Sequence, residues 1–464
     1  MSLRHDSEAE TRPETPGQAA KAGPIRAKIQ QVGKYRFAVL AVLFVSTAIN
    51  YLDRSVLSIV APDVSRDLGI SPEAMGWLFS GFAWTYALAQ IPGGRLVDRF
   101  GPRIVYFWAL IAWSAMTALG SLAKSFGFLF GSRMGLGLFE APAFPCNGRV
   151  AAAWFPRKER GRAVAVYTAG QFIGLGVAFP LIAWMAASLG WRHVFWILGG
   201  VGIAWALVWH RVIRNRPEEH PKVGENELVH ITDGEAEADN SAKAQEKGAF
   251  ARDLKFLLKQ RRIWGVFLGQ FAIASTLYFF LTWFPTYLTN ERGLSLDKGG
   301  LTGALPFIAA LVGVLCGGSW SDWMVQKGIS ASIARKTPIV TGLGLAGVIV
   351  AANYVTSNAA MIAIMCVAFF ANGLASFSWV LVTEIAPQRM LGVAGGVFNV
   401  FGNLAGIVVP IVIGYMVGGA DGSFTLPLIL IAGITIGGAL SFLFLVDKVE
   451  RIEDVPSTDL TRTA

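Results

Sequence analysis

Long apolar stretches alternate with short polar connections over most of the chain. A helix needs about 20 apolar residues to cross a hydrocarbon core of about 30 Å. Twelve stretches are long enough, and they lie near 37–60, 74–94, 104–123, 126–148, 163–187, 193–213, 263–289, 299–320, 337–355, 359–385, 392–417 and 424–446. The pattern therefore predicts an all-α membrane protein with twelve transmembrane helices.

One long polar connection, residues 214–260, divides the predicted spans into six plus six. The two halves also repeat each other, because Gly94-x-x-x-Asp98 follows the second span and Gly318-x-x-x-Asp322 follows the eighth. Duplicated halves around a midplane site are typical of secondary transporters. We expect two pseudo-symmetric six-helix bundles at 34–213 and 261–447, the connection being a cytoplasmic linker. The remaining segments, 1–33 and 448–464, are expected to be cytoplasmic tails, the first of them disordered.

Composition agrees with a polytopic membrane protein. The chain is 53% hydrophobic and 15% charged, with a mean hydropathy of +0.50. Its net charge of +9 does not indicate nucleic acid, because the lysines and arginines concentrate in the tails and in alternate loops. By the positive-inside rule, both termini should lie in the cytoplasm. The three cysteines lie apart within apolar runs, so we expect neither a disulfide framework nor a metal site.

Two adjacent charges, Asp53 and Arg54, stand near the end of the first apolar run. A charge at the centre of a membrane helix costs about 2.5 to 3.5 kcal/mol on insertion scales, so charges kept there usually serve a function. Tyr51 and Arg54 are three residues apart and share a helix face, whereas Asp53 is turned away by about 100°. An arginine fork can hold a carboxylate through two hydrogen bonds, which suits an organic anion.

The fourth span carries a second pair of charges, Arg133 and Glu140, two helical turns apart and therefore on one face. Gly137 between them leaves room for the arginine to reach the carboxylate, or for another helix to bring Asp53 close. One interpretation is a packing ion pair near the helix ends. The other is a carboxyl group whose protonation responds to burial and to the approach of arginine, as proton coupling requires.

Further polar residues in the spans could either orient substrate hydroxyls or join helices by hydrogen bonds. They are Tyr86, Gln171, Ser376, Ser378, Thr383, Asn399 and Asn403. Trp283 and Trp379 could equally be packing residues or stacking surfaces.

A basic motif follows the second span, and its residues are Gly94-Arg-Leu-Val-Asp98-Arg99-Phe-Gly101-Pro-Arg103. It resembles the loop between the second and third helices of the major facilitator superfamily, which acts there as a cytoplasmic gate latch. From Tyr35 to Lys448 the chain resembles the anion:cation symporter branch, and it is most similar to bacterial D-galactonate and D-glucarate proton symporters. The motifs that carry this resemblance include Asn50-Tyr-Leu-Asp-Arg54, Phe139-Glu-Ala-Pro-Ala-Phe-Pro145 and Gly395-Gly-Val-Phe-Asn399.

The resemblance implies a role for each candidate residue. Asp53 and Glu140 would be protonation sites, Arg133 would regulate Glu140, and Arg54 would hold the substrate carboxylate. The implied cavity residues are Tyr51, Tyr86, Gln171, Ser376, Ser378, Trp379 and Asn399, and the implied gating residues are Gly94, Asp98, Arg99, Arg103 and Asp322. The sequence around Asn403 is nearer the glucarate-like pattern, and the sequence around Gln171 is nearer the galactonate-like one. The resemblance therefore leaves the identity of the sugar acid open.

We therefore expect a transporter of the inner membrane that imports a sugar acid with protons, functions as a monomer and needs no cofactor beyond the coupling proton. A D-galactonate-like hexonate is the first candidate, with D-glucarate, a hexuronate or another organic anion, including an aromatic one, as alternatives. A membrane enzyme would need clustered catalytic or metal-binding side chains, which the spans lack. A non-transporting sensor would need a signalling domain, and no extramembrane stretch is large enough.

Overall fold

The structure is a computed structural model that describes residues 33–232, 249–294 and 296–453. Its regular elements in these ranges are all helical. The first half contains α1 (Tyr35–Ile59), α2 (Ala61–Leu68), α3 (Pro72–Phe100), α4 (Pro102–Gly120), α5 (Phe126–Glu140), α6 (Ala143–Trp154), α7 (Arg157–Leu189) and α8 (Trp191–Val212). The second half contains α11 (Arg261–Thr282), α12 (Phe284–Thr286), α13 (Leu296–Gln326), α14 (Ala331–Ala346), α15 (Asn358–Ala375), α16 (Trp379–Ile385), α17 (Leu391–Gly419) and α18 (Thr425–Phe444).

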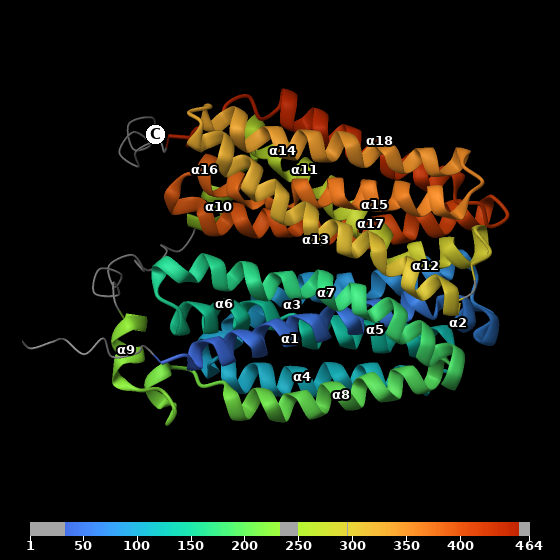
Figure 1. The fold of residues 1–464 in the computed structure, drawn as a ribbon, viewed down its shortest axis with the longest axis horizontal. Helices are drawn as coiled ribbons and strands as arrows, with labels where there is room; N and C mark the ends of the chain where they lie inside the picture. Colours follow the sequence, from blue (N-terminus) through green and yellow to red (C-terminus); the bar gives the residue numbers. More distant parts are fainter. Residues whose placement is uncertain (1–32, 233–248, 295, 454–464) are drawn as a thin grey trace, which may run out of the picture.

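These helices form two bundles that lie as two layers, the first half below the second in Figure 1. Ten segments of the described chain are long and apolar enough to cross a membrane by themselves. The other two expected crossings are α3, which ends in the charged motif, and the fourth span, which the structure divides into α5 and α6. The all-helical fold predicted from the sequence is confirmed.

Local sequence explains where the helices near the site begin and break. Ser71 accepts a hydrogen bond from the amide of Ala74 and caps α3, whose first residue is Pro72. The fourth span breaks after Glu140 because Pro142 cannot donate a backbone hydrogen bond within a helix and its ring crowds the preceding turn. The break places the Glu140 side chain at a helix end inside the bundle, where it is fully buried.

The bundles contact each other mainly through α3 against α17 and α7 against α13. A side chain on Gly76 of α3 would approach the carbonyl oxygen of Pro410 in α17 to 2.6 Å, so glycine permits this close contact. Nearby, Phe79 and Trp283 join the bundles edge to face with ring centroids 5.2 Å apart. These contacts close the interface at the end opposite the linker.

The described parts of the linker pack on separate bundles. Glu227 in α9 (Glu225–Thr232) is buried and accepts hydrogen bonds from the backbone amides of Tyr35 and Arg36, at the start of α1. The second linker helix, α10 (Ala249–Leu258), contacts α11 and α17 of the other bundle. Residues 1–32, 233–248 and 454–464, which hold most of the predicted tails and the middle of the linker, lie outside the described residues.

Candidate substrate and proton site

The centre of the site is the buried ion pair between Arg54 on α1 and Glu140 at the end of α5. Arg54 donates through Nε to Glu140 Oε1 at 2.6 Å, and its Nη2 lies 2.6 Å from the same oxygen. Side-chain exposure is 7% for the arginine and 0% for the glutamate. Separating the two groups here would leave an unpaired charge in the interior, which is strongly unfavourable. The pair should therefore persist until Glu140 is protonated or another anion takes its place at Arg54.

Three aromatic rings surround the Arg54 guanidinium. Its carbon lies 4.7 Å from the ring centroid of Tyr51, 4.6 Å from that of Phe82 and 4.7 Å from that of Tyr86. Each ring attracts a cation through its face, and together they restrict the positions the long side chain can adopt. The cage leaves the guanidinium at the edge of the central cavity described below, because Tyr51, Arg54 and Tyr86 all line that cavity.

Asp53 lies behind this pair, on the side of α1 that faces α4 and α5. It is fully buried, and its Oδ2 accepts a hydrogen bond from the indole nitrogen of Trp113 at 3.2 Å. Arg133 of α5 approaches the same turn but donates to the backbone carbonyls of Asp53 and Arg54, at 3.4 and 3.2 Å. Two carboxyl groups and two guanidinium groups are therefore buried together in the first bundle.

This arrangement differs from the one favoured by helical spacing alone. The hydrogen-bond partner of Glu140 is Arg54 from α1, and not Arg133 from its own helix. The space at Gly137 admits the backbone of α3 at Phe82 instead of a side chain from α1. The regulatory role of Arg133 stays a prediction.

A cavity of about 270 Å³ lies between the two bundles beside Arg54. Five of the residues predicted to bind substrate line it: Tyr51, Arg54, Tyr86, Gln171 and Asn399. The amide of Asn399 on α17 donates to Gln90 on α3 at 3.0 Å, so a hydrogen bond links the bundles across the cavity. The lining thus combines one guanidinium with amides and phenols, groups that can bind an anion carrying hydroxyls.

Three predicted binding residues are not among the lining residues of this cavity. Ser376 donates to a backbone carbonyl within its own helical segment, and Trp379 packs against Phe398 while 48% of its surface is exposed. Ser378 is buried and donates to the side-chain oxygen of Gln270, which does line the cavity. In this structure the serine can therefore act on the cavity only through that glutamine.

Three polar lining residues were missed by sequence reasoning: Gln90, Gln270 and Tyr278. Helical spacing could have indicated Gln90, which lies four residues after Tyr86 and so shares its face. Gln270, Ala274 and Tyr278 likewise follow at steps of four along α11. No feature of the sequence alone shows that this face of α11, rather than another, is turned to the centre.

The motif predicted to gate the carrier is paired within its own bundle. Asp98 at the end of α3 accepts a hydrogen bond from Arg149 of α6 at 3.1 Å. In the second half Asp322 accepts one from Arg335 of α14 at 2.8 Å, and Arg335 also bonds Glu384 at 3.1 Å. Each of the repeated aspartates thus contacts an arginine of its own bundle. The two arginines do not come from corresponding spans, since Arg149 lies on α6 of the divided fourth span and Arg335 on α14, the ninth span.

The other motif residues occupy the same end of the first bundle. Arg103 donates to the backbone carbonyl of His210, which joins α4 to α8, and Arg99 lies over the ring of Phe100 at 5.1 Å. Gly94 has open space where a side chain would stand. Their participation in gating stays a prediction.

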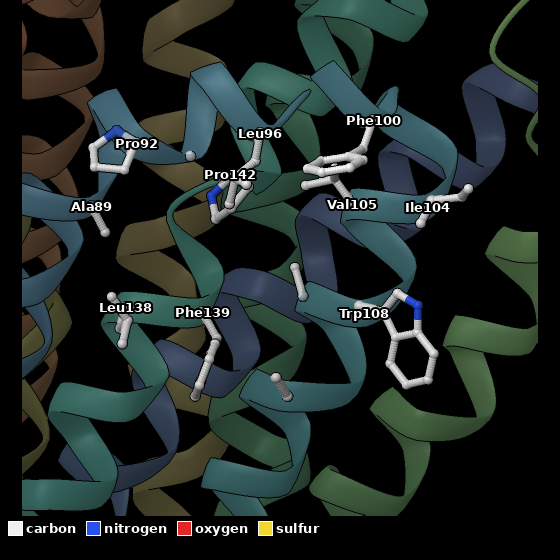
Figure 2. A pocket seen from close by; sticks show the side chains of 13 residues that line it. Ala89, Pro92, Leu96, Phe100, Ile104, Val105, Trp108, Leu138, Phe139 and Pro142 are labelled. Atoms are coloured by element: carbon white, nitrogen blue, oxygen red, sulfur yellow. The ribbon is translucent and has the colours of Figure 1, made fainter. Parts of the chain in front are cut away.

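A second, larger cavity of about 550 Å³ lies on the outer side of α3, α4 and α5 (Figure 2). Figure 2 shows Leu96, Trp108 and Phe139 among its walls, and all its lining residues are apolar or glycine. Its one polar side-chain group is the indole N–H of Trp108, and it has no cation to hold a carboxylate. We therefore assign the candidate site to the smaller, polar cavity between the bundles.

Among the described residues there is no group of three or more histidine, cysteine or acidic side chains arranged to hold a metal ion. The charged groups of the site are the Arg54–Glu140 ion pair and, beside it, Asp53 and Arg133.

Comparison with known proteins gives a consistent picture. The family model described as "Major Facilitator Superfamily" matches residues 43–410. The chain is 43% identical to the D-galactonate transporter of Escherichia coli O6:H1, covering 90% of this chain and 97% of that protein. It is 41% identical to a probable galactarate/D-glucarate transporter of Escherichia coli (strain K12), covering 91% and 95%.

A solved structure of a bacterial homologue of the human lysosomal transporter Spinster, in an inward-facing and unoccupied conformation, has a similar fold. The TM-score is 0.68 at 22% identity, covering 90% of this chain and 95% of that one.

Proposed function

Because the chain belongs to the major facilitator superfamily, a family of membrane transporters, we propose that it imports a sugar acid together with protons by alternating access. D-galactonate or a similar hexonate is the proposed substrate. The observation that carries the proposal is the placement of Arg54. This arginine is buried, held by three aromatic rings, at the edge of a polar cavity between the bundles, and paired to a carboxylate that can be neutralised by a proton.

The Arg54–Glu140 pair supports a direct form of coupling. A substrate carboxylate and the Glu140 carboxylate compete for one guanidinium fork. Protonation of Glu140 removes its charge and releases Arg54 to the substrate, and deprotonation returns Glu140 to Arg54 and expels the substrate. Proton and anion then have to move together, as symport requires.

Asp53 supplies a second buried carboxyl group one residue from Arg54. Its Oδ1 has no hydrogen-bond partner among the described residues. A buried carboxylate without compensation costs far more free energy than the neutral, protonated acid. We propose that Asp53 carries a coupling proton in the state described here.

The lining of the cavity favours a polyol with a single carboxylate. Amide and phenol groups from both bundles offer donors and acceptors for hydroxyls, and a ligand without hydroxyls would leave them unpaired. Arg54 is the one charged side chain in the described lining, so a monoanion is matched by one cation.

D-glucarate is the second candidate, because one of the relatives above is a probable galactarate/D-glucarate transporter. This dianion needs a second positive charge. Arg133 is a second arginine buried beside α1, yet its guanidinium donates to backbone carbonyls of α1 and Arg133 does not line the cavity. The geometry therefore favours D-galactonate.

We further propose that the protein lies in the bacterial inner membrane with both termini and the linker in the cytoplasm, as the distribution of lysine and arginine indicates. The closed interface at Gly76 and Phe79 is then on the outer side, and the state described here faces inward.

Uptake by purified protein in liposomes tests these proposals. An imposed inward proton gradient should drive accumulation of labelled D-galactonate, and unlabelled galactonate should compete better than glucarate, glucuronate or benzoate. Accumulation without a proton gradient would refute symport, and uptake of benzoate unaffected by sugar acids would refute the substrate class. In the same assay, Asp53→Asn should lose gradient-driven accumulation, because an amide cannot carry the proton.

A further inference from the structure

The side chain that contacts the Asp53 carboxyl group comes from α4, a helix that lines neither bundle interface nor central cavity. Trp113 is completely buried, and its Nε1 donates to Asp53 Oδ2 at 3.2 Å. The other carboxyl oxygen has no hydrogen-bond partner among the described residues, and Arg133 is bound to backbone carbonyls. Trp113 therefore makes the hydrogen bond that orients this carboxyl group.

An indole is suited to such a task because its N–H donates a hydrogen bond, its nitrogen accepts none, and it does not ionise at physiological pH. It cannot be a station on a proton path. A hydrogen bond donated to a carboxyl group favours the charged form over the acid and fixes the direction of the oxygen.

The position of the indole is determined by its packing. Tyr106 lies two helical turns before Trp113 on α4, and the two rings meet edge to face with centroids 5.4 Å apart. The Tyr106 hydroxyl donates a hydrogen bond to Asn50 Oδ1 at 3.2 Å. Asn50 precedes Asp53 by three residues on α1, so both donors of α4 hold the same face of α1.

We propose that Trp113 is a positioning residue for proton exchange at Asp53 and sets the pH range over which the carrier takes up protons. The inference rests on the proposed function, in which Asp53 carries a coupling proton. The charged groups that face Asp53 are Glu140 and Arg133 from α5, with Arg54 adjacent on its own helix. All of them remain in place when only the indole is changed.

The test replaces Trp113 by phenylalanine, which keeps an aromatic ring and removes the N–H. Initial rates of proton-driven D-galactonate uptake are measured in liposomes over a series of external pH values. Without the donated hydrogen bond the carboxyl group retains its proton to higher pH, so we expect half-maximal uptake to move about one pH unit upward. Exchange of internal for external galactonate, which needs no net proton release, should stay within about twofold of the parent at acidic pH.

Trp154→Phe is the matched control. Trp154 is also completely buried in the first bundle and donates one hydrogen bond through its indole, to the backbone carbonyl of Arg214 at 3.1 Å, away from any carboxyl group. Its pH profile should coincide with that of the parent. If Trp113→Phe is not recovered as folded protein, Trp113→Met fills the same site with a flexible side chain and carries the same expectation.

The outcomes separate this inference from the proposed function. An upward shift confined to the Trp113 variants supports the inference. If the pH profile of the Trp113 variants is unchanged, or if their uptake rate falls by the same factor at every pH, the inference is overturned and symport stays intact. Failure of the parent itself to show proton-driven uptake overturns the proposed function instead.

Discussion

Replacement of Glu140 by glutamine should separate substrate binding from proton coupling. In the structure Glu140 holds Arg54 through two contacts of 2.6 Å to one carboxylate oxygen. A substrate carboxylate has to displace this oxygen before it can use the arginine fork. Glutamine keeps the size of the side chain but has no charge, so it competes for the guanidinium much less strongly.

The magnitude follows from the interaction that is lost. A hydrogen bond to a charged group contributes about 1.5 to 3 kcal/mol net. At the lower end of this range, release of Arg54 should tighten D-galactonate binding about tenfold. The gain should appear at about pH 8 and shrink as the pH falls, because protonation of Glu140 in the parent has the same effect as the substitution.

Calorimetric titration of the purified variant and parent with D-galactonate at several pH values provides the measurement, and gradient-driven accumulation in liposomes should be lost in parallel. Glu384→Gln is a matched control, since Glu384 also accepts a hydrogen bond from an arginine, Arg335, but outside the lining of the central cavity. Equal affinity and equal pH dependence in Glu140→Gln and the parent would refute the competition for Arg54. So would undiminished accumulation by the variant.

Three further substitutions test other parts of the interpretation. Arg54→Lys keeps the charge but loses the planar fork, so substrate affinity measured by the same titration should fall at least tenfold; unchanged affinity would mean that the carboxylate binds elsewhere. Asp98→Asn removes the acidic partner of Arg149 and should favour the inward-facing state over the outward-facing one. Single cysteines introduced at the linker end should then be labelled more, and decreased labelling would contradict a latch. Gly137→Ala would drive a methyl group into the backbone of α3 at Phe82 and should cost about 1 to 3 kcal/mol, measured as a lower unfolding temperature. A matched alanine at Gly131, which has open space around it, should leave that temperature unchanged.

The fold was largely accessible from the sequence because each membrane crossing is a local property. A run of about 20 apolar residues can span the hydrocarbon core wherever it occurs in the sequence. In a helix, the backbone amides and carbonyls of such a run bond each other, so no partner from elsewhere in the chain is needed. The spacing of apolar runs therefore predicted the crossings, including the fourth, although its division at Pro142 appears only in the structure.

Part of the site was accessible for a similar reason. A charge within an apolar run is conspicuous, so Asp53, Arg54, Arg133 and Glu140 were identified without any coordinates. Their pairing was not. Two turns of one helix suggested Arg133 with Glu140, whereas the structure joins Glu140 to Arg54, 86 residues away along the chain.

The face that each helix turns to the centre was decided only by tertiary structure. In a bilayer the lipid tails are as apolar as the helix surface, so hydrophobic periodicity does not indicate the buried side as it does in water. Gln270 and Tyr278 line the cavity for this reason without a sequence signal, and Trp379 was assigned to a cavity that it does not line. The sequence by itself determined the number of crossings and the charges they carry. Close packing between helices, as at Gly76 and Gly137, decided which of those charges meet and which indole reaches Asp53.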